Sequence, residues 1–238
     1  MLKGLLSVFT RSNCPLCHRA AARCLCGDCL RQLQSSQLKN CSEFWRGDLP
    51  LFAWGIYGGQ LKRSLAVLKY ENCPQLGELM GCWLGKAWLN SPIYAKTKKV
   101  TVVPIPLHPK KLKQRGYNQA ELIARSFCRL TGYSLQPQGL ERVRETKALY
   151  GLSVEQRKDN LKSAFVVGKD FQRTKPRAPI LLIDDIYTTG TTVTEASKKL
   201  ISLGIQVLGV AALSKTVTIA DNKNSRKNQP KKKLKNIK

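Results

Sequence analysis

One stretch of thirteen residues constrains the fold more than any other part of the chain. It runs from Ile180 to Thr192 and reads Ile-Leu-Leu-Ile-Asp-Asp-Ile-Tyr-Thr-Thr-Gly-Thr-Thr. The four apolar residues at its start predict a short buried strand, and residues 193–203 have the apolar spacing of a helix. A strand, an acidic pair, a loop of small residues and a helix, in this order, are typical of α/β folds that bind phosphate where a strand ends.

The residue types in this stretch indicate a phosphorylated sugar. Backbone N–H groups can converge on a phosphate where the loop turns into the helix, and threonine hydroxyls add donors. Carboxylates are poor phosphate ligands, but they accept hydrogen bonds from sugar hydroxyls and can bind Mg²⁺. The predicted ligand is therefore a ribose 5-phosphate. Its predicted binding residues are Asp184, Asp185, Thr188, Thr189, Gly190, Thr191 and Thr192.

The same stretch resembles the phosphoribosyl-diphosphate (PRPP) loop of type I phosphoribosyltransferases. Residue type and order agree over thirteen positions: an apolar run, an acidic pair, two spacers and Thr-Thr-Gly-x-Thr. The resemblance implies an α/β fold with a mostly parallel sheet flanked by helices, and it implies PRPP as ligand with Mg²⁺ as cofactor. The alternative is an ordinary strand–turn–helix with a solvated acidic turn.

A second phosphate-binding segment is predicted after residues 100–106, whose apolar run predicts another buried strand ended by prolines. Residues 107–119 follow as a basic loop. Because ligands of parallel sheets bind at the edge where the strands end, we expect this loop to lie beside the phosphate loop. The alternative is a solvated basic loop. The predicted diphosphate-binding residues are Lys110, Lys111 and Arg115, of which Arg115 is best suited to a bidentate contact.

Near the N-terminus, Cys14, Cys17, Cys26 and Cys29 form two C-x2-C pairs with eight residues between them. Two such pairs can supply four thiolates at tetrahedral corners, and so small a segment needs a metal ion to fold. The spacing therefore predicts a zinc ribbon with a structural Zn²⁺. Cys24 is a rival ligand, but Cys26 has the correct spacing to Cys29. The alternative is a chance cluster of free thiols.

Taken together, these segments resemble the ComF family, in which a short cysteine ribbon precedes a type I phosphoribosyltransferase domain. Two further motifs carry the resemblance, Leu-Lys-Tyr at 68–70 and Arg-Gly-Tyr-Asn-Gln at 115–119. Leu149 departs from the pattern, because the family usually has glutamine there. The resemblance implies a role in DNA uptake during natural transformation, with single-stranded DNA and a helicase-like competence protein as partners.

The chain of 238 residues, 42% of them hydrophobic, is long enough for one sizeable core and a small appendage. We predict a cysteine-rich zinc ribbon over residues 1–40, a phosphoribosyltransferase-like domain over 51–215 and a disordered basic tail over 216–238. Residues 30–50 are polar and irregular, which predicts a linker between the first two segments.

The chain is strongly basic, with a formal net charge of +26. Residues 221–238 account for +7 of this charge, so +19 belongs to the rest of the chain. A basic body favours polyanions such as nucleic acid, although a generally basic surface is an equal alternative. No apolar run is long enough to span a bilayer, and the N-terminus is a poor signal peptide, so we expect a cytoplasmic protein with reduced or metal-bound cysteines.

Three functions are consistent with these features. The protein could bind PRPP or a related ribose phosphate and act in DNA uptake, it could bind a nucleotide or nucleic acid without turnover, or it could be an active phosphoribosyltransferase of nucleotide metabolism. No catalytic residue is predicted, because no pocket for an acceptor base can be read from the sequence. A scaffold that docks a partner protein through the ribbon is a weaker alternative.

Overall fold

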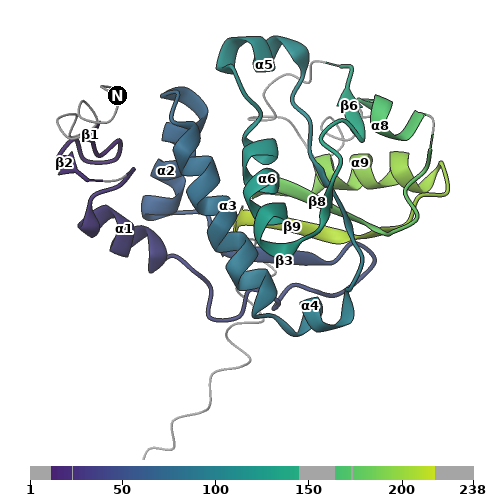
Figure 1. Cartoon of the computed structure of the whole chain (residues 1–238), viewed down its shortest axis with the longest axis horizontal. Coiled ribbons are helices and arrows are strands. Elements are labelled where there is room, and N and C mark those ends of the chain that lie inside the picture. The colour runs from purple at the N-terminus through teal and green to yellow at the C-terminus, as the bar shows by residue number, and fades with distance from the viewer. Residues whose placement is uncertain (1–11, 23, 145–163, 173, 218–238) are drawn as a thin grey trace, which may run out of the picture.

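The computed structural model of the protein describes residues 12–22, 24–144, 164–172 and 174–217. Its centre is a sheet of five strands in which every neighbouring pair runs parallel (Figure 1). The predicted fold class is therefore confirmed. In spatial order the strands are β3 (Leu51–Ile56), β9 (Val207–Lys215), β8 (Ile180–Tyr187), β4 (Thr101–Pro104) and β5 (Ser134–Leu135).

The central strand β8 is apolar on both sides because both faces of the sheet are covered. Leu181 and Ile183 are fully buried in one core, and Ile180 and Leu182 are fully buried in the other. A strand that is buried on both faces reads as a continuous apolar run rather than an alternating one. This explains why the run at 180–183 was recognisable as a strand.

Two helices, α3 (Pro74–Leu89) and α6 (Gln119–Thr131), cover the face of the sheet that is turned toward the viewer in Figure 1. They cross at very short range at Gly81, where an added Cβ would lie 2.5 Å from the carbonyl oxygen of Ile123. The helix α2 (Gly59–Tyr70) packs beside α3 and ends at the edge of the sheet where the strands end.

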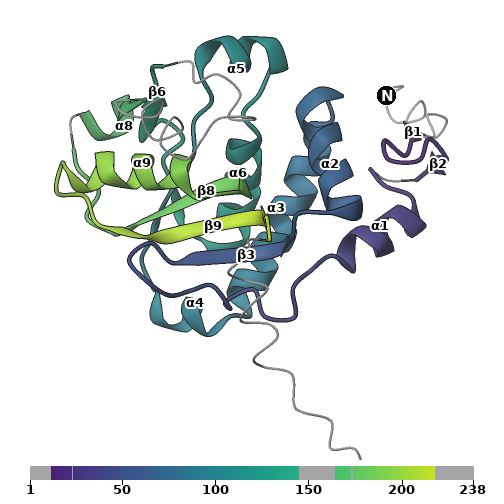
Figure 2. The same ribbon diagram turned by 180° about the vertical axis from the view of Figure 1, so that it is seen from behind.

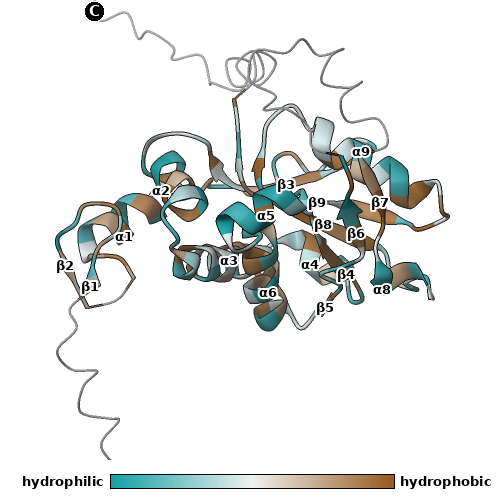
Figure 3. Ribbon diagram, turned by 90° about the horizontal axis from the view of Figure 1, so that it is seen from above, coloured by the Kyte–Doolittle hydropathy of each residue, from teal (hydrophilic) through white to brown (hydrophobic). Residues whose placement is uncertain are grey.

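The opposite face of the sheet carries the helix α9 (Thr191–Ile201), which is seen in front of the strands in Figure 2. Beside it lie an antiparallel pair, β6 (Leu140–Arg142) and β7 (Phe165–Val167), and the short helix α8 (Lys169–Gln172). These elements form the second core together with the remaining side chains of the sheet. The hydropathy colouring in Figure 3 shows the apolar strands enclosed between more polar helices.

The N-terminal part consists of β1 (Ser12–Asn13), β2 (Ala20–Ala21) and α1 (Gly27–Gln34), which lie beside α2 (Figure 1). The prediction of a linker over residues 30–50 is wrong, because this segment is packed onto the sheet. Leu33 is fully buried, and Trp45 packs edge-on against Trp88 with ring centroids 5.4 Å apart. The apolar residues of the segment are too widely spaced to form a periodic pattern, so their burial left no signal in the sequence.

No helix among the described residues is long and apolar enough to cross a membrane. Leu149, where the sequence departs from the ComF pattern, and residues 218–238 of the predicted tail lie outside the described residues. The boundaries of the three predicted segments stay predictions.

Candidate functional site

The candidate site lies at the carboxyl edge of the sheet, which is the edge where the parallel strands end. The acidic pair was predicted to follow the strand, but β8 continues through Asp184 and Asp185 as far as Tyr187. The reason is pairing with β9, in which Asp184 is in register with Ala212 and Tyr187 with Lys215. The apolar pattern ends at Ile183, but the pairing of the β8 backbone with β9 continues to Tyr187.

The predicted phosphate loop spans only residues 188–190, and α9 begins directly after it. Gly190 adopts a left-handed conformation with φ of 75°, and a side chain there would collide with the hydroxyl of Tyr187. The hydroxyls of Thr189 and Thr191 are hydrogen-bonded to each other at 2.7 Å. The left-handed conformation therefore favours glycine at this turn, and any other residue would require the Tyr187 side chain to move. The residues predicted to bind phosphate lie in the loop or in the first turn of α9: Thr188, Thr189, Gly190, Thr191 and Thr192.

Lys69, near the end of α2, received no role in the sequence analysis and is a central residue of this edge. Its Nζ lies 2.6 Å from Oδ2 of Asp185, and the two side chains are only 20% and 12% exposed. One of the two predicted ribose-binding carboxylates is therefore already paired with a cation of the protein. The Leu-Lys-Tyr motif at 68–70 was the one signal that could have identified this residue.

The acidic pair and Lys69 form a small buried charge cluster. Burial and the neighbouring Asp185 carboxylate raise the pKa of Asp184 well above its usual range. Burial by itself would lower the pKa of Lys69, but the carboxylates of Asp185 and Asp184 outweigh it and raise that pKa. Lys69 is therefore charged at neutral pH and partly compensates two carboxylates that the sheet holds side by side.

The segment predicted as a basic loop contains a short helix, α5 (Pro109–Arg115), so that part of the prediction is wrong. Pro109 occupies its first position, and Gly116 ends it in a left-handed conformation with φ of 83°. The Nδ1 of His108 accepts a hydrogen bond from the backbone N–H of Lys110 at 3.3 Å and so caps the helix. Proline at the start and glycine after the end are common helix boundaries. The residues between them are mostly charged and form no apolar stripe, so the helix was not predicted. In Figure 3 the helix is coloured as hydrophilic.

Two of the three predicted diphosphate-binding residues, Lys111 and Arg115, line a pocket of about 280 Å³. The guanidinium of Arg115 lies over the ring of Tyr70, 5.5 Å from its centroid, and is near enough to oppose the charge of Lys69. Lys110 is exposed and does not line the pocket. The basic pocket therefore adjoins the acidic pair through Lys69, which belongs to both. Its lining residues are Lys69, Tyr70, Asn72, Lys111, Gln114 and Arg115.

The remaining residues of the Arg-Gly-Tyr-Asn-Gln motif hold this pocket in position. The Tyr117 hydroxyl donates a hydrogen bond to the carbonyl oxygen of Leu68, which ties the motif to α2. The Asn118 side chain donates to the carbonyl oxygen of Ile105 at 3.0 Å and accepts from the backbone N–H of Ala120 at 3.2 Å. Asn118 thereby caps α6 and fastens it to the end of β4.

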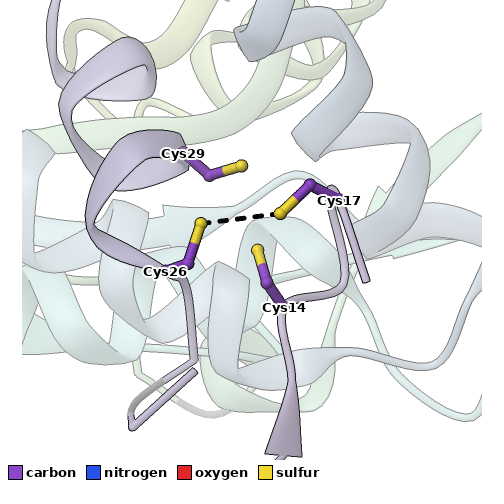
Figure 4. Close-up of side chains that lie close together, drawn as sticks. All are labelled: Cys14, Cys17, Cys26 and Cys29. Atoms are coloured by element: carbon purple, nitrogen blue, oxygen red, sulfur yellow. Dashed lines mark hydrogen bonds between the residues drawn. The ribbon is translucent and has the colours of Figure 1, made fainter. Parts of the chain in front are cut away.

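The four predicted metal ligands come together at the N-terminal part of the chain. The sulfur atoms of Cys14, Cys17, Cys26 and Cys29 all lie within 4.8 Å of one another, and those of Cys17 and Cys26 are 3.5 Å apart (Figure 4). Tetrahedral Zn²⁺ with Zn–S bonds of about 2.3 Å requires sulfur atoms about 3.8 Å apart. The group could therefore hold a metal ion such as zinc, and it includes Cys26 rather than Cys24.

A neighbouring charge supports the thiolate form of one member of this cluster, Cys17. The Nε of Arg19 donates to the sulfur of Cys17 at 3.5 Å, and this contact lowers the pKa of Cys17 to about 6. Arg19 is itself paired with Asp28 at 3.0 Å. Cys24 differs, because burial and the nearby Cys73 thiol raise its pKa to about 12. Burial raises the pKa of the ligand candidate Cys29 as well, so the exclusion of Cys24 rests on the distances between the sulfur atoms.

The fold and these two sites define a class: an α/β protein with a mostly parallel sheet flanked by helices, and with an N-terminal cysteine cluster that is compatible with a zinc ribbon. No family model matches the chain. Among curated proteins, the chain is 34% identical to competence protein F of Haemophilus influenzae over 114 residues, which are 48% of this chain and 49% of that protein. It is 32% identical to DNA utilization protein YhgH of Salmonella typhi over 116 residues, which are 49% of each chain.

A longer match is with competence protein ComFC of Bacillus subtilis, which is 25% identical over 207 residues, or 85% of this chain and 77% of that protein. The matched region spans about half the length of the first two relatives. Together these relatives support the assignment of the chain to the ComF family, as the sequence resemblance predicted.

Proposed function

We propose that the protein binds PRPP or a related ribose phosphate at the carboxyl edge of its sheet and acts in DNA uptake during natural transformation. The observation that carries the ligand assignment is the position of loop 188–190, between the acidic end of β8 and the first turn of α9. The names of the relatives, competence protein F, competence protein ComFC and DNA utilization protein YhgH, support the role in DNA uptake. A cytoplasmic protein that handles single-stranded DNA beside a helicase-like competence protein fits this role.

In this proposal, the 5-phosphate binds at the N-terminus of α9. The free N–H groups of the first turn and the positive end of the helix dipole favour an anion there. Thr188 and Thr189 are exposed, so their hydroxyls are accessible to a ligand. The ribose hydroxyls would bind the carboxylates of Asp184 and Asp185.

The diphosphate would bind in the basic pocket, where Lys111 and Arg115 already face a common space. Lys69 joins that pocket to Asp185 and would supply a third positive charge. Carboxylate oxygens are suitable ligands for Mg²⁺, so Asp184 and Asp185 fit a magnesium ion. When bound, Mg²⁺ would neutralise charge on the diphosphate.

Departure of the diphosphate would leave an oxocarbenium-like carbon on the ribose, which a base or another nucleophile attacks. The contribution of the protein would be to hold the two phosphate groups in a fixed geometry and to stabilise the charge that develops on the leaving group. Arg115 is suited to this task because its planar guanidinium is held against Tyr70.

A second candidate is a module that binds PRPP or a nucleotide without turnover. The observation that favours it is the Lys69–Asp185 ion pair, because a protein cation already occupies one side of the acidic pair. An active phosphoribosyltransferase of nucleotide metabolism is the remaining alternative. We also propose that the four-cysteine cluster holds a structural Zn²⁺, since a closed set of four sulfur ligands leaves no open position for catalysis.

Titration calorimetry with PRPP and Mg²⁺ tests the ligand assignment. We expect the double variant Asp184→Asn/Asp185→Asn to bind PRPP at least ten-fold more weakly than the wild type, and the exposed control Asp48→Asn to bind as the wild type does. Unchanged affinity of the double variant would refute the site. Diphosphate release from PRPP in the presence of mixed nucleobases then separates the two candidates: release indicates an enzyme, and binding without release indicates a non-catalytic module.

A further inference from the structure

A second polar pocket, of about 380 Å³, lies away from the candidate phosphate site. It is enclosed by residues 34–42, by β3 and by the segment from the last turns of α3 to the start of α4 (Pro92–Lys96). Figure 1 shows α4 at the bottom of the molecule and α5 at the top, so the two pockets lie toward opposite ends. The volume is within the range of about 300–1,000 Å³ that is typical of small-molecule sites.

The apolar side of this pocket is formed by two stacked tryptophans. Trp54 of β3 and Trp83 of α3 have ring centroids 5.5 Å apart and an interplanar angle of 15°. Trp54 is 1% exposed, whereas Trp83 is partly exposed and offers ring surface to a ligand. The indole N–H of Trp54 is buried and has no hydrogen-bond partner among the described residues. This donor is too deeply buried to meet a ligand, so the contact surface of the pair is the accessible part of the Trp83 ring.

The rest of the lining is rich in carboxamides and lysines and has no carboxylate. Lys39 and Lys86 are exposed, and neither forms an ion pair with a described residue. A carboxamide both donates and accepts hydrogen bonds, which is the chemistry that reads the edge of a nucleobase. The absence of acidic groups from this lining disfavours a cationic ligand. The carboxamides are those of Gln34, Gln37, Asn40 and Asn90.

We propose that this pocket binds a nucleobase of a single-stranded nucleic acid. The base would stack on Trp83 and form hydrogen bonds with the carboxamides. Lys39 and Lys86 would contact the flanking phosphates. Stacking on an aromatic side chain and a positively charged rim are the two features that single-strand binding sites share. This inference concerns a site separate from the one proposed for PRPP.

The test compares two labelled probes of equal charge by fluorescence anisotropy, using the full chain. One is an oligothymidylate of about twelve nucleotides, and the other is an abasic oligonucleotide of the same length. We expect the wild type to bind the thymidylate about ten-fold more tightly, because only that probe can stack. We expect Trp83→Leu to abolish this preference and to leave the slope of affinity against salt concentration unchanged. By contrast, Lys86→Gln should weaken the binding of both probes equally, and it should reduce the slope of log affinity against log salt concentration by about 0.7.

A variant of the carboxamide side chains keeps the test decisive if the loss of Trp83 disturbs the fold. Gln37→Ala combined with Asn90→Ala changes two exposed side chains and should reduce the preference for thymidylate at least three-fold. The control Asn72→Ala, in the other pocket, should leave the preference unchanged. Equal binding of both probes by the wild type, or an undiminished preference in the Gln37/Asn90 variant, would overturn the proposal. Competition by free dTMP as strong as that by the oligonucleotide would overturn its assignment to a strand. PRPP affinity should not change in the Trp83, Lys86 and Gln37/Asn90 variants, so the two proposals fail independently.

Discussion

Removing the positive charge of Lys69 should destabilise the protein, because two carboxylates would then lie at the carboxyl edge without their counter-ion. The substitution Lys69→Met tests this effect, since methionine keeps most of the length and apolar surface of the side chain. Lys69 and Asp185 are mostly buried, so solvent screens their interaction only in part. The effect should therefore be much larger than that of a surface ion pair.

The magnitude follows from the distance between the charges. At the 2.6 Å separation of Lys69 Nζ and Asp185 Oδ2, two unit charges attract by about 6 kcal/mol with an effective dielectric constant of about 20. Desolvation of both groups offsets part of this attraction, and removal of one partner of a buried pair usually costs about 3–5 kcal/mol. Because neither side chain is fully buried, we expect the lower end, about 3 kcal/mol. This corresponds to a fall in Tm of about 6–12 °C for a chain of this size.

The loss of stability caused by Lys69→Met should depend on pH, and the acidic pair determines its direction. Asp184 has a raised pKa in the folded protein, so the folded state binds protons more readily than the unfolded state, and this carboxyl destabilises the fold most at neutral and higher pH. Without the charge of Lys69, which lowers the pKa of Asp184, that pKa should rise further. The destabilisation caused by Lys69→Met should therefore decrease as the pH is lowered from neutrality toward the ordinary carboxyl range near about 4.

Urea unfolding followed by circular dichroism at several pH values measures both quantities. The exposed Lys62 lies on the same helix, so Lys62→Met is the matched control and should change the free energy of unfolding by less than about 0.5 kcal/mol. A loss below about 1 kcal/mol for Lys69→Met at neutral pH would contradict the inferred strength of the pair. A loss that does not vary with pH would contradict the role assigned to the carboxylates.

Three further substitutions test other parts of the structure. We expect the purified protein to hold about one zinc ion per chain. Cys26→Ser should lose most of this zinc, whereas Cys24→Ser should retain it. Elemental analysis of the purified variants measures the zinc content of each. Asn118→Ala should lower the free energy of unfolding by about 1–2 kcal/mol, because α6 loses its cap. Asn118→Asp keeps the accepting oxygen and should recover part of that loss in the same denaturation assay. Gly81→Ala should destabilise by about 1–3 kcal/mol because its Cβ would press on the Ile123 carbonyl; a thermal melt that matches the wild type would contradict the described crossing of α3 and α6.

The features that could be predicted from the sequence are those that depend on local residue types. The run at 180–183 identified the central strand because burial on both faces leaves only apolar residues there. The two C-x2-C pairs identified the cysteine cluster because a metal site of this kind requires fixed spacing within a short segment. Loop 188–190 was predicted for a similar reason, since small hydroxylated residues surround Gly190 within a short segment.

The features that could not be predicted depend on partners that are distant in the sequence. Strand β8 extends through Asp185 because β9 continues beside it, and no local pattern carries that information. No local pattern assigned a role to Lys69, yet the end of α2 brings it to Asp185, 116 residues further along the chain. The connector over 35–50 looked like part of a linker because it is polar and irregular, although Leu38 and Trp45 pack against the core.

That connector also has a consequence for self-association. Strand β3 is an outer strand of the sheet, and its free backbone groups would be able to pair with another chain. Here they are occupied: Leu38 donates to the carbonyl oxygen of Trp54, and Ala53 donates to that of Cys41. The opposite outer strand, β5, has only two residues and offers little to pair with. Helix α1 joins the cysteine cluster to this connector, so loss of the proposed metal ion would endanger the shielding of β3 and promote aggregation through that strand.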